Sequence, residues 1–128
     1  MLLLDTCAVL WLAGDQDTLS DAAKQAIAAS AGSLFVSAIT AFEMAHKHRQ
    51  GKLTLPIVPD QWYPEALNTH GLAELPITGA ISLGAVALPR IHRDPCDRLI
   101  VATALAEDLP IVTADETIPQ YPGVHVIW

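Results

Sequence analysis

The chain has 128 residues, which is enough for one domain (residues 1–128) with its own hydrophobic core, without disulfide or metal cross-links. Apolar residues make up 52% of the chain, aromatic residues 5% and charged residues 16%, which excludes disorder and favours helices packed over a buried parallel sheet. The formal net charge of -7 argues at first sight against a nucleic-acid partner, because such binding depends on lysine and arginine at phosphates.

The predicted strands and helices alternate along the chain. In chain order they are a strand at 1–5, helices at 6–13 and 20–30, a strand at 34–36, helices at 37–49 and 59–70, a strand at 71–77, helices at 78–88 and 95–108, and strands at 110–113 and 124–128. Ser37 is the expected N-cap of the third helix. This alternation predicts an α/β fold with a parallel sheet.

The N-terminal apolar segment does not fit a signal peptide, because Asp5 interrupts it and no lysine or arginine precedes Lys24. The apolar segment at 75–89 is too short to cross a bilayer. Cys7 and Cys96 form no C-x-x-C pair. The sequence therefore predicts a soluble cytoplasmic protein, without a membrane segment, in which both cysteines are free thiols.

Acidic residues gather where the predicted strands end. Asp5 closes the first strand, and Thr113 and Asp115 close the fourth. Glu43 lies less than two turns into the helix after the second strand, and Asp97 lies in the first turn of the helix before the fourth. Because ligands of open parallel sheets bind beyond the carboxyl ends of the strands, we expect these side chains to share one edge of the sheet.

The segment HRDPCDR has a simpler interpretation on its own. Asp94 suits the N-cap, Pro95 the first helical position, and Asp97 the third position, where a carboxylate meets the positive end of the helix dipole. Capping alone would explain this segment, just as a turn would explain Asp5. It does not explain four carboxylates at one edge, which would repel one another and raise their own pKa values unless a cation were bound. Oxygen ligands without a suitable Cys or His set favour Mg²⁺ or Mn²⁺.

Six of the seven basic residues fall in two stretches. These stretches contain Lys47, Arg49 and Lys52, and Arg90, Arg93 and Arg98. Solvated helix ends would account for them, but both stretches flank the acidic residues. Lys47, Arg49, Arg93 and Arg98 are therefore candidates to bind a polyanion beside the metal.

Four segments, LLLDTCAVLWL, VSAITAFEMAHK, HRDPCDRLIVATAL and IVTADE, occur in the order and spacing of the PIN-domain ribonucleases. The chain most closely resembles the VapC toxins of bacterial type II toxin-antitoxin systems, and the resemblance covers essentially its whole length. It implies a three-layer α/β/α fold with a five-stranded parallel sheet. It also implies a homodimeric, Mg²⁺- or Mn²⁺-dependent endoribonuclease that a VapB-type antitoxin inhibits.

The resemblance also assigns roles to matching positions. They are Asp5, Glu43, Asp97 and Asp115 as the acidic metal-binding and catalytic set, with Thr6, Asp94 and Thr113 in support. We expect Asp5 and Asp97 to bind the principal ion directly, and a water of lowered pKa to attack the phosphate. Two positions depart from the family pattern: Cys96 replaces a bulky apolar residue, commonly Phe, and Cys7 a residue that is often polar. We expect both departures to be tolerated.

Two other functions compete with the nuclease. An aspartyl-phosphate phosphotransferase or receiver domain would also have Asp5 at the end of a first strand, but Asp5-Thr6-Cys7 lacks the second Asp of a D-x-D motif. A catalytically inactive binding module would not need all four acidic positions filled. His46 and His48 are two apart on a helix, do not share a face, and are expected at the solvated surface.

Two features bear on protein partners. The aromatic residues Trp11, Trp62 and Tyr63 could line a groove for an antitoxin segment, although burial is commoner and is favoured for Trp11. The small residues of 78–88 would allow close packing against a second subunit, or ordinary packing against the sheet.

Overall fold

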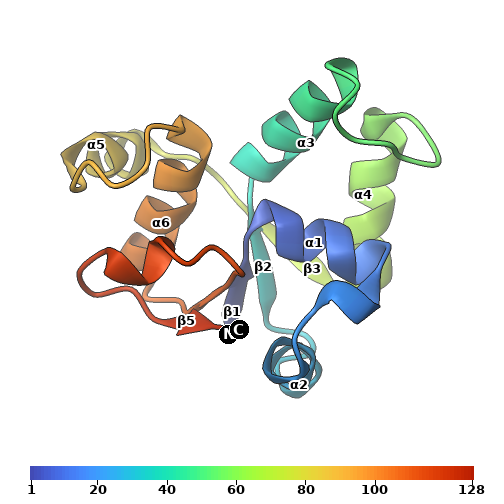
Figure 1. The fold of residues 1–128 in the computed structure, drawn as a ribbon, viewed down its shortest axis with the longest axis horizontal. Helices are drawn as coiled ribbons and strands as arrows, with labels where there is room; N and C mark the ends of the chain where they lie inside the picture. Colours follow the sequence, from blue (N-terminus) through green and yellow to red (C-terminus); the bar gives the residue numbers. More distant parts are fainter.

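The computed structural model describes residues 1–128 (Figure 1). Its elements are β1 (Leu2–Leu4), α1 (Thr6–Ala13), η1 (Gln16–Thr18), α2 (Asp21–Ala29), β2 (Leu34–Ser37), α3 (Ile39–Arg49), α4 (Pro59–His70), β3 (Leu72–Leu75), α5 (Gly79–Ala87), α6 (Pro95–Glu107), β4 (Ile111–Val112), η2 (Ile118–Gln120) and β5 (Val126–Ile127). None of the helices is both long and apolar enough to span a membrane. The predicted alternation of strands and helices is confirmed.

All five strands are parallel and lie in the order β3-β2-β1-β4-β5. The chain builds outward from β1 to β2 and β3, and then returns to the other side of β1 to add β4 and β5. The strand order therefore reverses between β1 and β4. In open parallel sheets, a crevice forms at such a reversal, beyond the carboxyl ends of the strands.

The side chains of β1 alternate between the two faces of the sheet, as the strand period of two requires. Leu2 and Leu4 pack in one core cluster with residues of α1, α2, α3 and α4, whereas Leu3 packs in another with residues of α6 such as Ile100. Figure 1 shows the sheet between these groups, with α5 and α6 on one side and α1, α2 and α4 on the other. The predicted three-layer α/β/α arrangement is confirmed.

The structure corrects some predicted boundaries. Ser37 is not the N-cap of α3, because it is still paired with Leu75 of β3, and the chain becomes helical only at Ala38. Its hydroxyl still accepts a hydrogen bond from the N–H of Ile39 at 3.2 Å. Strand β3 is shorter than the predicted 71–77, since Pro76, which follows it, has no N–H to donate to a sheet. Strand β5 is limited to the two residues that pair with β4.

The start of α6 is held by two side chains. The carboxylate of Asp94 accepts a hydrogen bond from the N–H of Cys96 at 2.8 Å, as the sequence predicts for an N-cap. The guanidinium of Arg98 donates to backbone carbonyls in α5 and in the α5–α6 loop, those of Ala85, Val86, Leu88, Pro89 and His92, at 2.7 to 3.3 Å. Arg98 therefore fixes the loop that leads into α6.

We expect Arg98→Met to lower the free energy of unfolding by about 1–3 kcal/mol, because it leaves carbonyls that face a charged donor without that partner. Arg98→Lys should recover less than half of the loss, since an ammonium lacks the planar fork of the guanidinium. Urea unfolding measures both changes. The exposed Arg93 supplies the matched control, since Arg93→Met should change stability by no more than about 0.5 kcal/mol. Equal stability of Arg98→Met and wild type would contradict this role.

Candidate metal-dependent nuclease site

Asp5 joins the two strands at which the sheet reverses. It directly follows β1, and its Oδ1 accepts a hydrogen bond from the N–H of Ala8 at 2.8 Å, so it is the N-cap of α1. Its Oδ2 accepts the hydroxyl hydrogen of Thr113, which follows β4, at 2.5 Å. The hydroxyl of Thr113 in turn accepts the N–H of Asp115 at 3.0 Å. Asp5, Thr113 and Asp115 are thus brought together as predicted.

Glu43 approaches the same edge from α3. It is buried, with 8% of its surface exposed, and its Oε2 lies 3.4 Å from the ammonium of Lys47, one turn further along the helix. Its Oε1 is buried and has no hydrogen-bond partner. Because an unpaired buried carboxylate oxygen costs free energy, this atom indicates a group that the protein itself does not supply.

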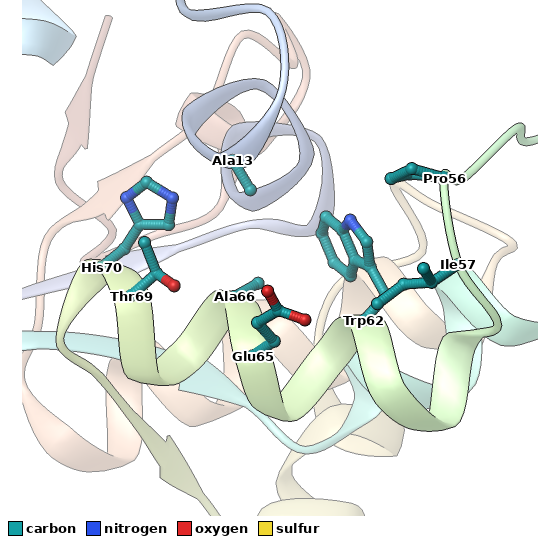
Figure 2. Close-up of a pocket in the computed structure, with 8 residues that line it drawn as sticks. All are labelled: Ala13, Pro56, Ile57, Trp62, Glu65, Ala66, Thr69 and His70. Atoms are coloured by element: carbon teal, nitrogen blue, oxygen red, sulfur yellow. The ribbon is translucent and has the colours of Figure 1, made fainter.

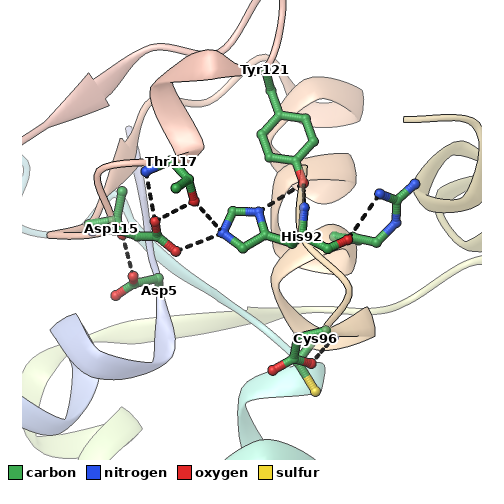
Figure 3. Close-up of polar contacts among 9 residues, drawn as sticks. Asp5, His92, Cys96, Asp115, Thr117 and Tyr121 are labelled. Carbon is green, nitrogen blue, oxygen red and sulfur yellow. Dashed lines mark hydrogen bonds and ion pairs between the residues drawn. The ribbon is translucent and has the colours of Figure 1, made fainter. Parts of the chain in front are cut away.

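Asp115 is held by more partners than the other carboxylates. Its Oδ1 accepts the N–H of Thr117 at 2.8 Å and the Thr117 hydroxyl at 2.6 Å. Its Oδ2 lies 2.8 Å from Nε2 of His92 (Figure 3). The sequence did not identify His92 or Thr117 as site residues. His92 is the first residue of the HRDPCDR segment, but nothing local in the sequence shows that it meets Asp115.

All four predicted carboxylates line one cleft of about 320 Å³. Its lining consists of Asp5, Thr6, Cys7, Trp11, Glu43, Lys47, Asp94, Asp97, Ala114 and Asp115. Thr6 is buried and shares a hydrogen bond of 3.0 Å with the hydroxyl of Thr40, so it braces α1 against α3. Trp11, which was expected in the core, is only partly buried and also borders this cleft. The centroid of its ring lies 5.5 Å from that of the Trp128 ring.

The cleft disfavours the ionised form of two of these carboxylates. Burial raises the pKa of Asp5 to about 6, although hydrogen bonds from Thr113 and Ala8 oppose the shift. Burial also raises the pKa of Asp97 to about 6, and the negative charges of Asp94 and Glu43 add to this effect. A cation in the cleft would favour the ionised form of both groups.

The pKa of Asp115 shifts in the opposite direction from those of Asp5 and Asp97. Burial acts to raise its pKa, but hydrogen bonds from Thr117 and His92 together hold that pKa below its ordinary value. Asp115 therefore supplies a negative charge that is already stabilised, whereas Asp5 and Asp97 supply charges that need a counter-ion.

The side chains present fit a hard divalent cation. One potential ligand atom each from His92, Asp97 and Asp115 lies within 4.8 Å of the other two. Asp5 and Glu43 stand outside this close group but line the same cleft, and Glu43 contributes the unpaired oxygen. Carboxylate oxygens are the ligands that Mg²⁺ and Mn²⁺ prefer. The two free thiols are less suitable as metal ligands. Cys7 is exposed at the rim of the cleft, and burial raises the pKa of Cys96 to about 12, which disfavours the thiolate that a metal would bind.

The structure separates the predicted RNA-binding residues. Lys47 lines the cleft, whereas Arg49 and Arg93 are exposed at the surface. Arg98 is not brought into the cleft, because its guanidinium is engaged with backbone carbonyls. Lys52 lines a neighbouring groove of about 380 Å³, in which the exposed ring of Phe42 stacks on His46.

Another hollow lies between the end of α1 and helix α4. It has a volume of about 420 Å³ and is bordered by Ala13, Pro56, Ile57, Trp62, Glu65, Ala66, Thr69 and His70 (Figure 2). Trp62 is buried, with 9% of its surface exposed, and the hydroxyl of Tyr63 donates to Glu74 at 2.8 Å. A groove for an antitoxin segment at these aromatic residues stays a prediction.

Comparisons with known proteins agree with this geometry. The family model of the PIN domain matches residues 2–124. Ribonuclease VapC22 of Mycobacterium tuberculosis (strain ATCC 25618 / H37Rv) is 36% identical, over 98% of this chain and 97% of the relative. Among solved structures, a chain of a toxin-antitoxin complex from Klebsiella pneumoniae has a TM-score of 0.65 and 27% identity, over 97% of this chain and 95% of that one.

A chain of DNA-bound VapBC from Salmonella typhimurium has a TM-score of 0.70 at 16% identity, over 98% of this chain and 97% of that one. At that identity the similarity supports the fold alone. The family model and the M. tuberculosis relative go further, since both match nearly the full length, including the segments on which the predicted resemblance rests. The chain therefore belongs to the PIN-domain family, in its VapC group.

Proposed function

We propose that this protein is a Mg²⁺- or Mn²⁺-dependent endoribonuclease, acting in the cytoplasm as one PIN domain. The observation that carries the proposal is the buried Oε1 of Glu43, which has no partner in a cleft where the pKa values of Asp5 and Asp97 are both raised to about 6. A divalent cation would satisfy the unpaired oxygen and favour ionised carboxylates at the same time. VapC22, the M. tuberculosis relative, is a ribonuclease, which supports the same activity here.

The carboxylates divide the work of holding the cation. Asp5 and Asp97 form no salt bridge and have raised pKa values, so they would bind the cation directly, with Glu43 contributing its unpaired oxygen. Asp115, whose oxygens already accept three hydrogen bonds, would bind it through water. Asp94 caps the start of α6, which carries Asp97. Thr113, at the end of β4, would hold Asp5 in place through its hydrogen bond. When bound, Mg²⁺ or Mn²⁺ lowers the pKa of a coordinated water and neutralises phosphate charge.

Lys47 is the basic residue best placed to bind the RNA backbone. Burial acts to lower its pKa, but Glu43 and the other negative groups of the cleft together raise it above its ordinary value, so Lys47 stays protonated. Its ammonium lies at the cleft, where it would bind a phosphate adjacent to the scissile one. Arg49 and Arg93 are exposed and would bind phosphates further along the strand.

The proposal includes a VapB-type antitoxin as inhibitor and a homodimer as the active assembly. Two of the structural relatives are VapBC complexes, and another is a toxin-antitoxin complex. For the homodimer, the supporting feature is the outer face of α5, where Leu83 and Val86 are 75% and 81% exposed. Exposed apolar side chains of this size on one helix face are typical of a surface that another subunit covers.

We expect Asp5→Asn, Glu43→Gln and Asp97→Asn each to lower the rate of RNA cleavage by about 100-fold or more, because each removes a charge that holds the cation. Cleavage by the wild type should require Mg²⁺ or Mn²⁺, stop in EDTA, and leave 5′-phosphate and 3′-hydroxyl ends. A gel assay on a labelled RNA with end-group analysis measures all of these.

The matched control for this assay is Asp108→Asn. Asp108 is exposed at the end of α6 in a left-handed conformation that asparagine also adopts, so its substitution removes one charge outside the cleft without strain. Its activity should equal that of the wild type. RNA products with 2′,3′-cyclic phosphates would contradict the proposed chemistry, and a wild type that binds RNA without cutting it would favour the inactive binding module.

The raised pKa values predict that the free energy of unfolding of the metal-free protein falls as the pH rises. Because the folded state keeps the proton of Asp5 to about pH 6 while the unfolded state loses it near 3.8, this carboxylate destabilises the fold increasingly as pH rises through that window. In EDTA, Asp5→Asn should therefore gain stability relative to wild type between about pH 5 and pH 7.5, by about 1.4 kcal/mol. Mn²⁺ should stabilise only the wild type, and more at the higher pH. Urea unfolding with and without Mn²⁺ measures this, and a pH-independent difference would contradict it.

We expect the double variant Leu83→Ser, Val86→Ser to shift the protein from dimer to monomer, because the exposed apolar face of α5 is lost. Sedimentation equilibrium measures the association constant. Val58→Ser, at a valine that is 54% exposed just before α4, should leave the dimer intact. A monomeric wild type at high protein concentration would exclude the homodimer.

A further inference from the structure

His92 lies in the loop between α5 and α6, yet its imidazole contacts three residues of the C-terminal segment. Its Nε2 lies 2.8 Å from Oδ2 of Asp115 and 2.6 Å from the hydroxyl oxygen of Thr117, and its Nδ1 lies 2.8 Å from the hydroxyl of Tyr121 (Figure 3). The side chain is 13% exposed. None of these three contacts is explained by the packing of the loop alone.

Hydrogen accounting at Nε2 shows which ring nitrogen carries the hydrogen. The hydroxyl of Thr117 already donates its hydrogen to Oδ1 of Asp115, so towards His92 it offers only a lone pair. The other neighbour of Nε2 is a carboxylate oxygen of Asp115, which accepts as well. Two acceptors within hydrogen-bond distance require a hydrogen on Nε2.

Tyr121 completes the arrangement on the other side of the ring. Its hydroxyl oxygen accepts the backbone N–H of His92 at 3.1 Å and lies 2.8 Å from Nδ1 of the same residue. If the ring hydrogen is on Nε2 alone, Nδ1 has a lone pair and the hydroxyl of Tyr121 donates to it. Tyr121 is buried, with 2% of its surface exposed. The two rings are parallel within 5° at a centroid distance of 5.6 Å, which fixes the plane of the imidazole.

This arrangement supplies Asp115 with a hydrogen-bond donor whose direction is fixed by the plane of the imidazole ring. With His92 on Oδ2 and Thr117 on Oδ1, the carboxylate plane is set from both ends. An imidazole N–H that holds a carboxylate in this way acts through the carboxylate rather than on the substrate.

We propose that His92 is a positioning residue, whose Nε2–H orients Asp115 for the cation while Tyr121 selects that tautomer, and that His92 is not itself a metal ligand. This inference rests on the proposed metal-dependent function. His92, Asp97 and Asp115 lie close enough together to share a metal ion, but on this inference His92 contacts Asp115 and does not coordinate the ion.

The test replaces His92 by two residues with amide side chains of different length, Asn and Gln. The amide nitrogen of Gln reaches about as far from the backbone as Nε2, whereas that of Asn reaches only as far as Nδ1. His92→Asn should therefore weaken Mn²⁺ binding, measured by calorimetry, by about 10–100-fold and lower RNA cleavage similarly. His92→Gln should stay within about fivefold of the wild type in both, while His125→Asn, at an exposed histidine, should match the wild type.

The readouts separate this inference from the proposed function. Wild-type protein that neither binds Mn²⁺ nor cleaves RNA would overturn the function itself. If the wild type binds and cleaves, unchanged Mn²⁺ affinity in His92→Asn would overturn the positioning role, and an equally large loss in His92→Gln would show direct ligation instead. Nitrogen NMR of the metal-free protein gives an independent check, since a hydrogen found on Nδ1 rather than on Nε2 would overturn the inference.

Discussion

The parallel pairing of β1 with β4 is the constraint on which the cleft depends. Both strands end at the same edge of the sheet, so Asp5 and Thr113 become hydrogen-bonded neighbours although 108 positions separate them in the chain. Asp115 follows within two residues, and α3 and α6 bring Glu43 and Asp97 to the same cleft. The site is thus a consequence of topology, and each carboxylate comes from a different part of the chain.

The carboxylates of the cleft differ in their hydrogen-bond partners and in their pKa values. Asp115 accepts hydrogen bonds from Thr117 and His92 and keeps a pKa below its ordinary value, whereas burial raises the pKa values of Asp5 and Asp97 to about 6. Lys47 is the one cation that lines the cleft, and it pairs with a single oxygen of Glu43. The negative charge of the cleft is therefore left incompletely balanced by the protein, which is the electrostatic condition for binding a divalent ion.

Sequence patterns predicted what is local or repeated along the chain. Apolar runs located all five strands, and Asp94 with Pro95 located the start of α6, because these features depend on neighbouring residues. The four acidic positions followed from their place after strands and near helix starts. Boundaries were less predictable, as Ser37 shows, because pairing with Leu75 of a distant strand keeps it extended. The contacts of His92 and Arg98 were not predictable for the same reason: only the tertiary fold brings Asp115 near His92 and the backbone carbonyl of Ala85 near Arg98.

The α5–α6 loop joins the outer surface of the molecule to the cleft. Arg98 donates to the carbonyl of Val86, whose side chain is exposed on α5, and also to the carbonyl of His92. His92 in turn holds Asp115. One guanidinium and one imidazole therefore connect an exposed apolar helix face with a carboxylate of the cleft, through hydrogen bonds that are each 3.3 Å or shorter. Because both side chains belong to the HRDPCDR segment, this segment does more than begin a helix: its polar residues fix a loop, cap α6 and contact Asp115 at the same time.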